Sequence, residues 1–209
     1  MVLDAYRDVA DKVLLPLARR FSKVSPNTLT WSALVCAAFA GIGFLFRGVL
    51  PLLFGALFVF LNALLDALDG KVAKITGKAS RRGDFLDHIL DRYADVLILG
   101  GITLGPFCYQ WPWLGLLAII GVLLTSYMGT QAQAVGAGRI YAGVLGRADR
   151  LVILFAAALL QAVYDPDSLV VLGIDPARYT VLAWTMAVFA VLGNLTAIQR
   201  AVATWRRLT

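Results

Sequence analysis

The sequence predicts an all-α integral membrane protein with six transmembrane helices and an N-terminal amphipathic interfacial helix. Three observations lead to this fold class. The 209 residues are 60% hydrophobic, with a mean hydropathy of +0.77. Only 15% of the residues are charged, which is too few to cover a soluble domain of this size. The charged residues also gather between long apolar runs instead of being spread evenly.

The first element is an amphipathic helix over residues 2–21. Its apolar stripe consists of Leu3, Tyr6, Ala10, Val13, Leu14 and Leu17. Such a helix is typical of one lying along the cytoplasmic face of a membrane, and a helix packed against the bundle is the alternative. The charges among the first 25 residues leave no pattern of a cleavable signal peptide. We assign residues 1–26 to an N-terminal cytoplasmic segment and 27–209 to a six-helix domain.

The six membrane helices follow from length and hydropathy. A spanning helix needs roughly 20 mostly apolar residues. Six segments approach this length, and Gly- or Pro-containing breaks separate them. They are residues 28–46, 51–73, 85–105, 113–135, 149–164 and 179–201.

The charges of the connecting segments alternate in step with these helices. Lys and Arg concentrate in residues 7–23, 74–82, 139–150 and 200–207, whereas the intervening connections carry Arg47 alone, no charge, or mostly acidic residues. By the positive-inside rule, both termini and the 74–84 connection are cytoplasmic in a cell membrane. Aromatic residues gather near the opposite interface: Tyr109, Trp111, Trp113, Tyr164 and Tyr179. We therefore attribute the net charge of +6 to topology and anionic lipid, and expect no nucleic-acid partner.

The two cysteines, Cys36 and Cys108, lie far apart in apolar surroundings. This context favours packing residues over a disulfide or a metal pair.

Acidic residues at the ends of the second and third spans are the most informative feature of the sequence. All 13 acidic residues are Asp. Asp66 and Asp69 share one face of a helix, as do Asp87 and Asp91, and the two helices are adjacent and antiparallel. Four carboxylates that converge near a membrane require cations. Oxygen ligands in this number suit Mg²⁺, Mn²⁺ or Ca²⁺, and two such ions about 4 Å apart serve phosphoryl transfer.

Glycines and basic residues beside the aspartates indicate a phosphate-bearing ligand. Gly70 and Gly83 allow close approach of a ligand, although ordinary helix packing is an alternative for either glycine. The neighbouring cations are Lys74, Lys78, Arg81 and Arg82. A metal-ion transporter would also carry intramembrane aspartates, but it favours positions near mid-membrane and an inverted repeat, which this sequence lacks. A scaffold without catalysis leaves the aspartates unexplained.

The pattern Asp66-x-x-Asp69-Gly70-x-x-Ala73-Lys74, followed by Gly83-x-x-x-Asp87-x-x-x-Asp91, resembles the signature of the CDP-alcohol phosphotransferases. The predicted six-helix architecture and the SPNTLT stretch (25–30) extend the resemblance over most of the chain. The family usually has Arg where this chain has Lys74, and lysine lacks the two-pronged grip of arginine on phosphate.

The resemblance implies phospholipid biosynthesis: an alcohol attacks the β-phosphorus of a CDP-linked lipid and CMP leaves. It also implies two divalent cations, Mg²⁺ or Mn²⁺, and a homodimer. Asp66, Asp69 and Asp87 would hold one ion, and Asp66, Asp87 and Asp91 the second, with Asp91 as general base for the acceptor hydroxyl. The CDP moiety would contact Asn27, Thr28, Leu29, Thr30, Gly70, Lys74, Ser80 and Gly83.

The acceptor is less constrained by the sequence. Arg139, Arg147 and Arg150 at the cytoplasmic ends of the fourth and fifth spans would bind a phosphorylated acceptor, or would only set topology. The stretches 83–95 and 146–154 look similar to the branch of the family that makes phosphatidylinositol phosphate or archaetidylinositol phosphate from inositol 1-phosphate. Glycerol-3-phosphate, serine and inositol remain alternatives, and the lipid is based on either diacylglycerol or archaeol.

Three other polar features have structural interpretations. His88 points away from Asp87 and is expected to pack or hydrogen-bond at a helix interface instead of binding metal. Gln131 and Gln133 line the polar cavity or bond between helices. Arg92 and Asp95 are expected to form a neutralising pair across one helix turn.

Overall fold

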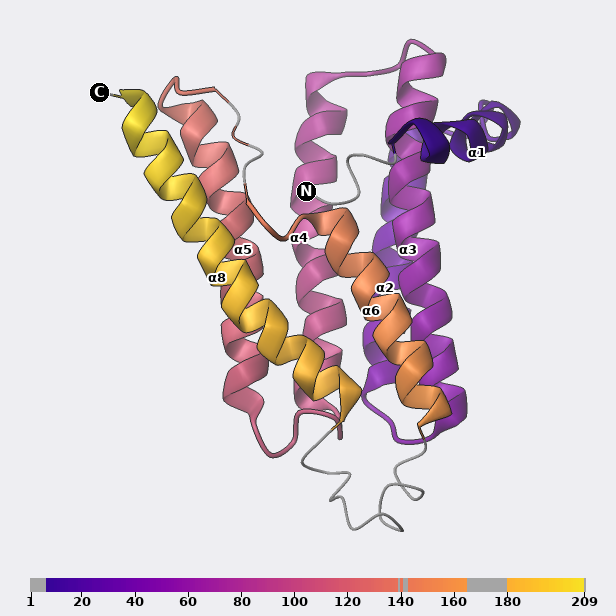
Figure 1. Ribbon diagram of the computed structural model, residues 1–209. Coiled ribbons are helices and arrows are strands. Elements are labelled where there is room, and N and C mark those ends of the chain that lie inside the picture. The colour runs from indigo at the N-terminus through magenta and orange to yellow at the C-terminus, as the bar shows by residue number, and fades with distance from the viewer. Residues whose placement is uncertain (1–6, 139, 141–142, 165–179, 209) are drawn as a thin grey trace.

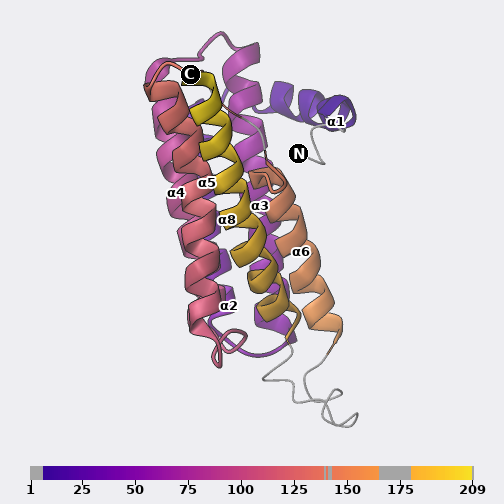
Figure 2. The same ribbon diagram turned by 60° about the vertical axis from the view of Figure 1, so that its left-hand side comes forward.

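The computed structural model describes residues 7–138, 140, 143–164 and 180–208, and these form seven α-helices (Figure 1). The helices are α1 (Arg7–Arg20), α2 (Pro26–Phe44), α3 (Val49–Ile75), α4 (Arg81–Leu104), α5 (Pro112–Ala134), α6 (Arg147–Val163) and α8 (Val181–Leu208). From α2 onward they run side by side as an elongated bundle, and α1 lies across one end of it (Figures 1 and 2).

Each of the six predicted apolar segments corresponds to one helix, but several helices extend beyond the segments. α4 begins at Arg81 instead of residue 85, and α8 continues to Leu208 instead of residue 201. The differences arise because a hydropathy window stops where charges begin, whereas backbone hydrogen bonding does not. Ser80 marks the true start of α4, since its Oγ accepts a hydrogen bond from the Gly83 amide at 3.1 Å.

Four of the described helices, α2, α3, α5 and α8, are long and apolar enough to cross a membrane. The chain is therefore an all-helical membrane protein. α6 has only 17 residues, and α4 carries charged residues from Arg81 to Asp95, including Asp87 and Asp91. The prediction of six spans is thus supported for four helices by length and composition, and it remains a prediction for α4 and α6.

Close backbone contact holds α2 against α4. A Cβ atom built on Gly101 of α4 would lie 2.6 Å from Cα of Gly41 in α2, which is closer than real atoms approach. Helices in lipid gain little from hydrophobic burial against each other, so small residues that let backbones meet provide the dispersion contacts. α2 also packs along α3, α5 along α8, and α6 against both α3 and α8.

Buried polar side chains in the bundle bond to the backbone of neighbouring helices. Asn62 in α3 donates to the Ala33 carbonyl of α2 at 2.9 Å. Arg200 in α8, placed by the sequence among tail charges, is only 7% exposed and donates to the Thr125 carbonyl of α5 at 2.7 Å. Each contact satisfies a group that would be costly to bury alone. Cys36 and Cys108 are free and buried, as expected for packing residues.

Helix α1 packs on the part of α3 that precedes the α3–α4 connection. Ala18, Leu29, Leu68 and Val72 form a small buried cluster, with Leu14 and Leu17 of α1 against it. A helix is therefore present from Arg7, and Leu14 and Leu17 of the predicted stripe pack against the bundle, whereas Val13 is 69% exposed. Leu3 and Tyr6 of the predicted stripe lie outside the described residues.

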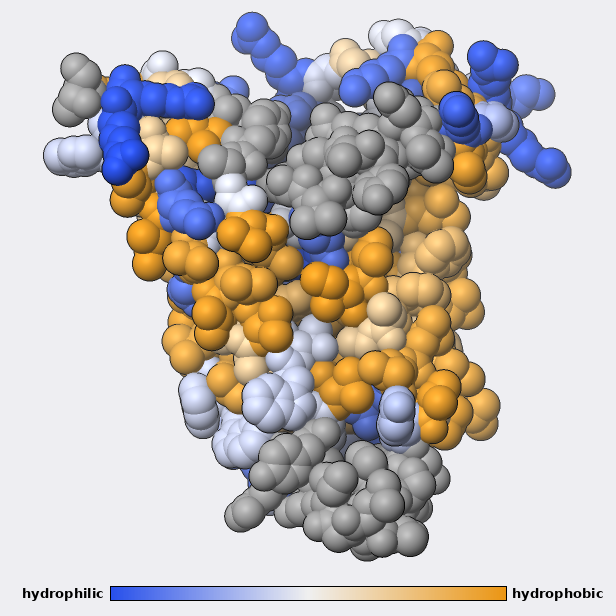
Figure 3. Space-filling model, in the orientation of Figure 1, coloured by the Kyte–Doolittle hydropathy of each residue, from blue (hydrophilic) through white to orange (hydrophobic). Residues whose placement is uncertain are grey.

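The surface divides into an apolar belt and a hydrophilic end, where α1 and α8 carry basic residues in their last turns. Figure 3 shows hydrophobic residues gathered around the middle of the molecule, with strongly hydrophilic side chains at the end that carries α1 and the α3–α4 connection. The end of α8 lies at this same end of the bundle (Figure 1). One end of the molecule thus combines basic side chains with the segment that bears the aspartate motif.

Candidate metal centre and adjoining pocket

Two antiparallel helices bring the aspartates together. Asp66 and Asp69 lie near the end of α3, and Asp87 and Asp91 lie near the start of α4. The chain reverses between them at residues 76–80, where Gly77 adopts a φ of +66°, a left-handed conformation that favours glycine. The spacing of three and four residues then directs each pair toward the facing helix.

Three of the four carboxylates converge directly. Asp66, Asp69 and Asp87 each offer an oxygen atom, and these atoms all lie within 4.8 Å of one another. Asp69 is 6% exposed, and its Oδ2 atom has no hydrogen-bond partner in the described part of the chain. A buried carboxylate oxygen without a donor is costly unless a cation neutralises it. The donor set is all carboxylate, so these residues fit a hard divalent cation such as Mg²⁺ or Mn²⁺.

The fourth aspartate, Asp91, is joined to this group by an arginine. Arg147 of α6 places Nη1 at 2.5 Å from Asp66 Oδ2 and Nη2 at 2.9 Å from Asp91 Oδ1. Asp91 is therefore close to the metal centre, but its carboxylate faces a guanidinium. The sequence predicted that Arg147 lies at the cytoplasmic end of its helix, but not that it enters the aspartate cluster.

A second arginine and a fifth aspartate lie behind Arg147. Arg150 of α6 donates through Nη2 to Asp95 Oδ2 in α4 at 3.0 Å, and both side chains are buried. Arg92 lies one turn before Asp95, with Nε at 3.8 Å from Asp95 Oδ2, so the pair predicted across this helix turn is present. Arg147 Nε also lies 3.8 Å from Asp95 Oδ1. Three arginines, Arg92, Arg147 and Arg150, thus have a nitrogen atom within 3.8 Å of an Asp95 oxygen atom.

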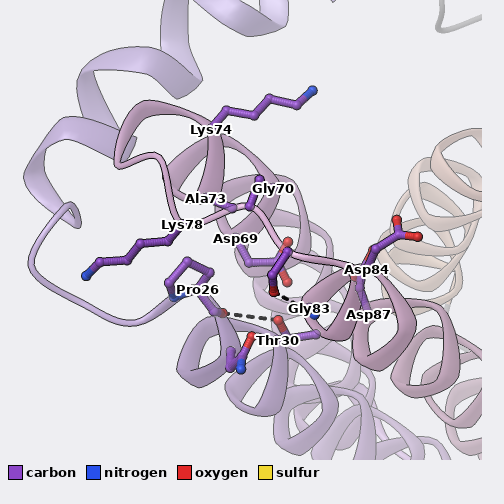
Figure 4. A pocket seen from close by; sticks show the side chains of 13 residues that line it. Pro26, Thr30, Asp69, Gly70, Ala73, Lys74, Lys78, Gly83, Asp84 and Asp87 are labelled. Atoms are coloured by element: carbon purple, nitrogen blue, oxygen red, sulfur yellow. Dashed lines mark hydrogen bonds between the residues drawn. The ribbon is translucent and has the colours of Figure 1, made fainter.

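A pocket of about 180 Å³ adjoins the aspartates on the side of the α3–α4 connection (Figure 4). Its lining comes from the start of α2, the end of α3, the connection itself and the start of α4. The lining residues are Pro26, Asn27, Thr30, Asp69, Gly70, Ala73, Lys74, Lys78, Ala79, Ser80, Gly83, Asp84 and Asp87. Figure 4 shows the Lys74 and Lys78 side chains at the rim, with their ammonium ends directed away from Asp69.

Gly70 lines this pocket, and the space where a side chain would lie is empty. A Cβ atom built on Gly70 meets no heavy atom within 4 Å, so helix packing does not require a glycine here. On Gly83, a Cβ atom would lie 3.3 Å from Ser80 Oγ and 3.6 Å from Asn27 Oδ1. The space left by Gly70 is therefore available to a ligand rather than filled by protein.

Six of the eight residues predicted to contact the CDP moiety line the pocket, namely Asn27, Thr30, Gly70, Lys74, Ser80 and Gly83. Thr28 is exposed and does not line it. Leu29 is buried in the small cluster with Ala18, Leu68 and Val72. Successive residues of a helix point about 100° apart, so a continuous stretch from 27 to 30 could not all face one pocket.

Lys78, named from the sequence among the cations beside the aspartates, and Ala73 of the signature also line the pocket. Three further lining residues were not assigned to it from the sequence: Pro26, Ala79 and Asp84. Asp84 lies in the first turn of α4, between Asp69 and Asp87 in sequence, so its place between the two acidic pairs was the available signal. Nothing in the local pattern distinguished Ala79 from its neighbours.

The three arginines expected at an acceptor differ in position. Arg139 lies outside the described residues. Arg147 adjoins Asp66 and Asp91, and its side chain is 16% exposed. Arg150 is 4% exposed and already has Asp95 as a partner.

A separate cavity of about 630 Å³ lies between α4 and α5. His88 lines it with Gln133 and Tyr127, whereas Gln131 is exposed and is not part of the lining. His88 Nδ1 lies 3.8 Å from Asp87 Oδ2 and 3.9 Å from Asp84 Oδ1, and it is not part of the three-carboxylate group. This position agrees with a histidine at a helix interface.

Comparison with known proteins gives a consistent result. The family model described as CDP-alcohol phosphatidyltransferase matches residues 23–192. The archaetidylinositol phosphate synthase of Methanothermobacter thermautotrophicus is 32% identical over 212 residues, which cover 99% of this chain and 96% of that protein.

Two solved structures are also similar. The phosphatidylinositol phosphate synthase of Mycobacterium tuberculosis with bound CDP-DAG has a TM-score of 0.70 and 25% identity, covering 93% of this chain and 94% of that one. The same enzyme in complex with manganese and citrate has a TM-score of 0.71 and 24% identity, covering 92% of this chain and 88% of that one, and this likeness bears on the fold alone.

Proposed function

This chain belongs to the CDP-alcohol phosphatidyltransferase family, and from that membership we propose that it transfers the lipid group of a CDP-linked lipid to inositol 1-phosphate. The transferase chemistry itself is that of the family, which works with divalent metal ions. One observation carries the proposal for the site: three carboxylates offer oxygen atoms within 4.8 Å of one another, and two of them, Asp69 and Asp87, line a pocket with two lysines at its rim. That arrangement suits a metal-bound diphosphate.

In the proposed metal centre, Asp66, Asp69 and Asp87 hold one divalent ion, and Asp66, Asp87 and Asp91 complete a second. When bound, such ions neutralise charge on the diphosphate and stabilise the leaving phosphate. The unpartnered Oδ2 of buried Asp69 supports this assignment.

The pocket is proposed to bind the CDP moiety. Asn27, Thr30 and Ser80 supply hydrogen-bonding groups, and Gly70 leaves room for the ligand. Lys74, with Lys78 beside it, reaches the phosphates from the rim by turning inward, which a long flexible side chain permits. Gly83 keeps the start of α4 close to Ser80, and Thr28 and Leu29 act by placing their neighbours at the pocket.

The proposed reaction is an in-line displacement at the β-phosphorus. Asp91 accepts the proton of the acceptor hydroxyl as the new oxygen–phosphorus bond forms, and the bond to CMP breaks. The chain contributes orientation above all, because phosphoryl transfer needs little covalent assistance from protein groups. Arg147 Nη2 lies 2.9 Å from Asp91 Oδ1 and orients this carboxylate, and the guanidinium must leave Asp91 before the carboxylate accepts a proton.

The acceptor is proposed to carry a phosphate that the arginines of α6 and the preceding segment recognise. Arg147 is the better placed of the two described arginines, because it borders the aspartates and retains some exposure. Arg150 holds Asp95 behind it, and Arg139 completes the proposed set. The relatives named for phosphorylated inositol products support this acceptor over glycerol-3-phosphate, serine or inositol.

The membrane arrangement is proposed as six spans, α2 to α6 and α8, with both termini and the active site in the cytoplasm. Exposed Lys and Arg residues in α1, at the end of α3 and at the end of α8 support this orientation. Exposed Tyr109, Trp113 and Tyr164, in or next to the α4–α5 connection and at the end of α6, support it as well. Helix α1 then lies along the inner membrane face, with residues 1–26 as a segment distinct from the 27–209 domain. A homodimer is proposed on family grounds.

The test is a CMP-release assay on purified protein in detergent with Mn²⁺ or Mg²⁺. CDP-diacylglycerol and CDP-archaeol are each combined with inositol 1-phosphate, glycerol-3-phosphate, serine or inositol. CMP release that depends on inositol 1-phosphate is expected. Turnover with a different acceptor only would refute inositol 1-phosphate as the acceptor but would still support transfer from a CDP-linked lipid. Absence of turnover with all four acceptors would contradict the proposed function.

A further inference from the structure

The charges around the metal centre do not balance without a cation. Five carboxylates belong to the cluster: Asp66, Asp69, Asp87, Asp91 and Asp95. Three guanidinium groups reach it from α4 and α6: Arg92, Arg147 and Arg150. Five negative and three positive groups leave a formal charge of −2, which one divalent ion neutralises.

The arginines contact some of these carboxylates more closely than others. Asp66, Asp69 and Asp87 remain able to offer one oxygen each to a common ion. Asp91 is different, because Arg147 lies 2.9 Å from its Oδ1 and Arg92 lies 3.3 Å from its Oδ2. Both oxygens of Asp91 are therefore engaged by arginines.

We propose that Arg147 serves as the second cation of the resting site, so that a second divalent ion binds only together with a nucleotide diphosphate. The proposal rests on the proposed function and concerns the order in which its metal centre is filled. Arg147 bridges Asp66 and Asp91, which are two of the three residues assigned to the second ion. An ion there must share those carboxylates with the guanidinium or displace it.

Electrostatics explains the coupling to the diphosphate. A second divalent ion in the resting site would raise the formal charge of the cluster from zero to +2, among buried groups where unbalanced charge is costly. The diphosphate of a CDP-linked lipid brings about two negative charges and restores neutrality. Arg147, once displaced from Asp91, becomes available to an anionic acceptor, so donor binding prepares the acceptor side.

The experiment counts Mn²⁺ ions bound to purified protein by electron paramagnetic resonance of the free ion, with and without CDP, after the Mn²⁺ bound by the same CDP concentration without protein has been subtracted. The wild-type chain is expected to bind one Mn²⁺ tightly without CDP and two with saturating CDP. Arg147→Met is expected to bind the second ion without CDP, at least about tenfold more tightly than wild type does. Arg150→Met is the matched control, since it removes a buried charge next to Asp95 but leaves the Arg147 contacts with Asp66 and Asp91.

The outcomes separate this inference from the proposed function. Two ions in wild type without CDP, or one ion both with and without CDP, would overturn the role of Arg147. An equal effect of Arg150→Met would also overturn it, by showing that net charge rather than occupancy controls the second ion. Binding of no Mn²⁺ under any condition would remove the metal centre itself. Where Arg147→Met does not fold, two ions bound to wild type without CDP would still overturn the inference.

Discussion

Arg150 of α6 and Asp95 of α4 form a buried ion pair at 3.0 Å, between two helices that pack mainly on other partners. α6 lies against α3 and α8, and α4 lies against α2 and α5. The pair therefore connects two parts of the bundle through charge instead of apolar packing. Asp95 also lies 3.8 Å from Nε of Arg147, which in turn contacts Asp66 and Asp91.

Breaking this pair should destabilise the protein. Asp95→Ala leaves Arg150 buried without its partner, and we expect a loss of about 3–5 kcal/mol in the free energy of unfolding. Thermal unfolding in detergent, followed by size-exclusion chromatography, measures the effect. The double variant Asp95→Ala with Arg150→Met should recover part of the loss, because no uncompensated charge remains. Equal stability of Asp95→Ala and wild type would contradict this account.

Asp69→Asn should abolish turnover without unfolding the chain. The amide keeps the size of the side chain but removes the negative charge on a buried group at the metal centre. CMP release should fall by at least about a thousandfold, as expected when a metal site is lost. Binding of Mn²⁺ should fall with it, whereas Asp84→Asn, outside the carboxylate group, should retain Mn²⁺ binding. Retained activity in Asp69→Asn would refute the ligand assignment.

Gly70→Ala should weaken substrate binding without destabilising the folded protein. The added methyl group meets no protein atom within 4 Å, so the helix should gain about 0.5–1 kcal/mol from alanine's higher helix propensity. The same methyl group occupies the pocket, and KM for the CDP-linked lipid should rise by about tenfold or more. Steady-state kinetics and thermal unfolding together test this.

Gly100→Ala provides the matched control for Gly70→Ala. Gly100 also has open space in place of a Cβ atom, but it lies in α4 away from the pocket lining. It should show the same gain in stability with unchanged KM. Equal kinetic effects of the two variants would show that Gly70 acts through the helix and not through the ligand.

Lys74→Arg should improve binding of the CDP-linked lipid. Lysine offers a single mobile ammonium group at the rim, whereas arginine grips two phosphate oxygens at once. We expect KM for the lipid to fall by about threefold with little change in kcat, and Lys74→Gln to raise KM. An unchanged KM in both variants would mean that Lys74 does not reach the diphosphate.

Sequence reasoning located the helices and much of the site, because both depend on local pattern. Runs of apolar residues marked the six long helices, and the spacing of Asp66, Asp69 and Asp87 predicted their convergence. The helix ends were less accurate, since charged residues such as those after Ser80 continue a helix that hydropathy alone would end.

The contacts of Arg147 could not have been predicted in the same way. Its guanidinium meets Asp66 and Asp91, residues far away in sequence, only because α6 packs across α3. No periodicity encodes which of several arginines at one membrane face turns inward. Burial of Arg200 against Thr125 is a second example, since its position resembles an ordinary tail charge until α8 is placed beside α5.

The small cluster beneath α1 has a consequence for the metal centre. Leu68 lies next to Asp69 in sequence and belongs to the same buried cluster as Ala18 of α1. The α1 contact and the Asp69 carboxylate therefore share one turn of α3. A substitution that loosens this cluster, such as Ala18→Asp, is expected to lower activity through the position of Asp69, although it lies outside the pocket.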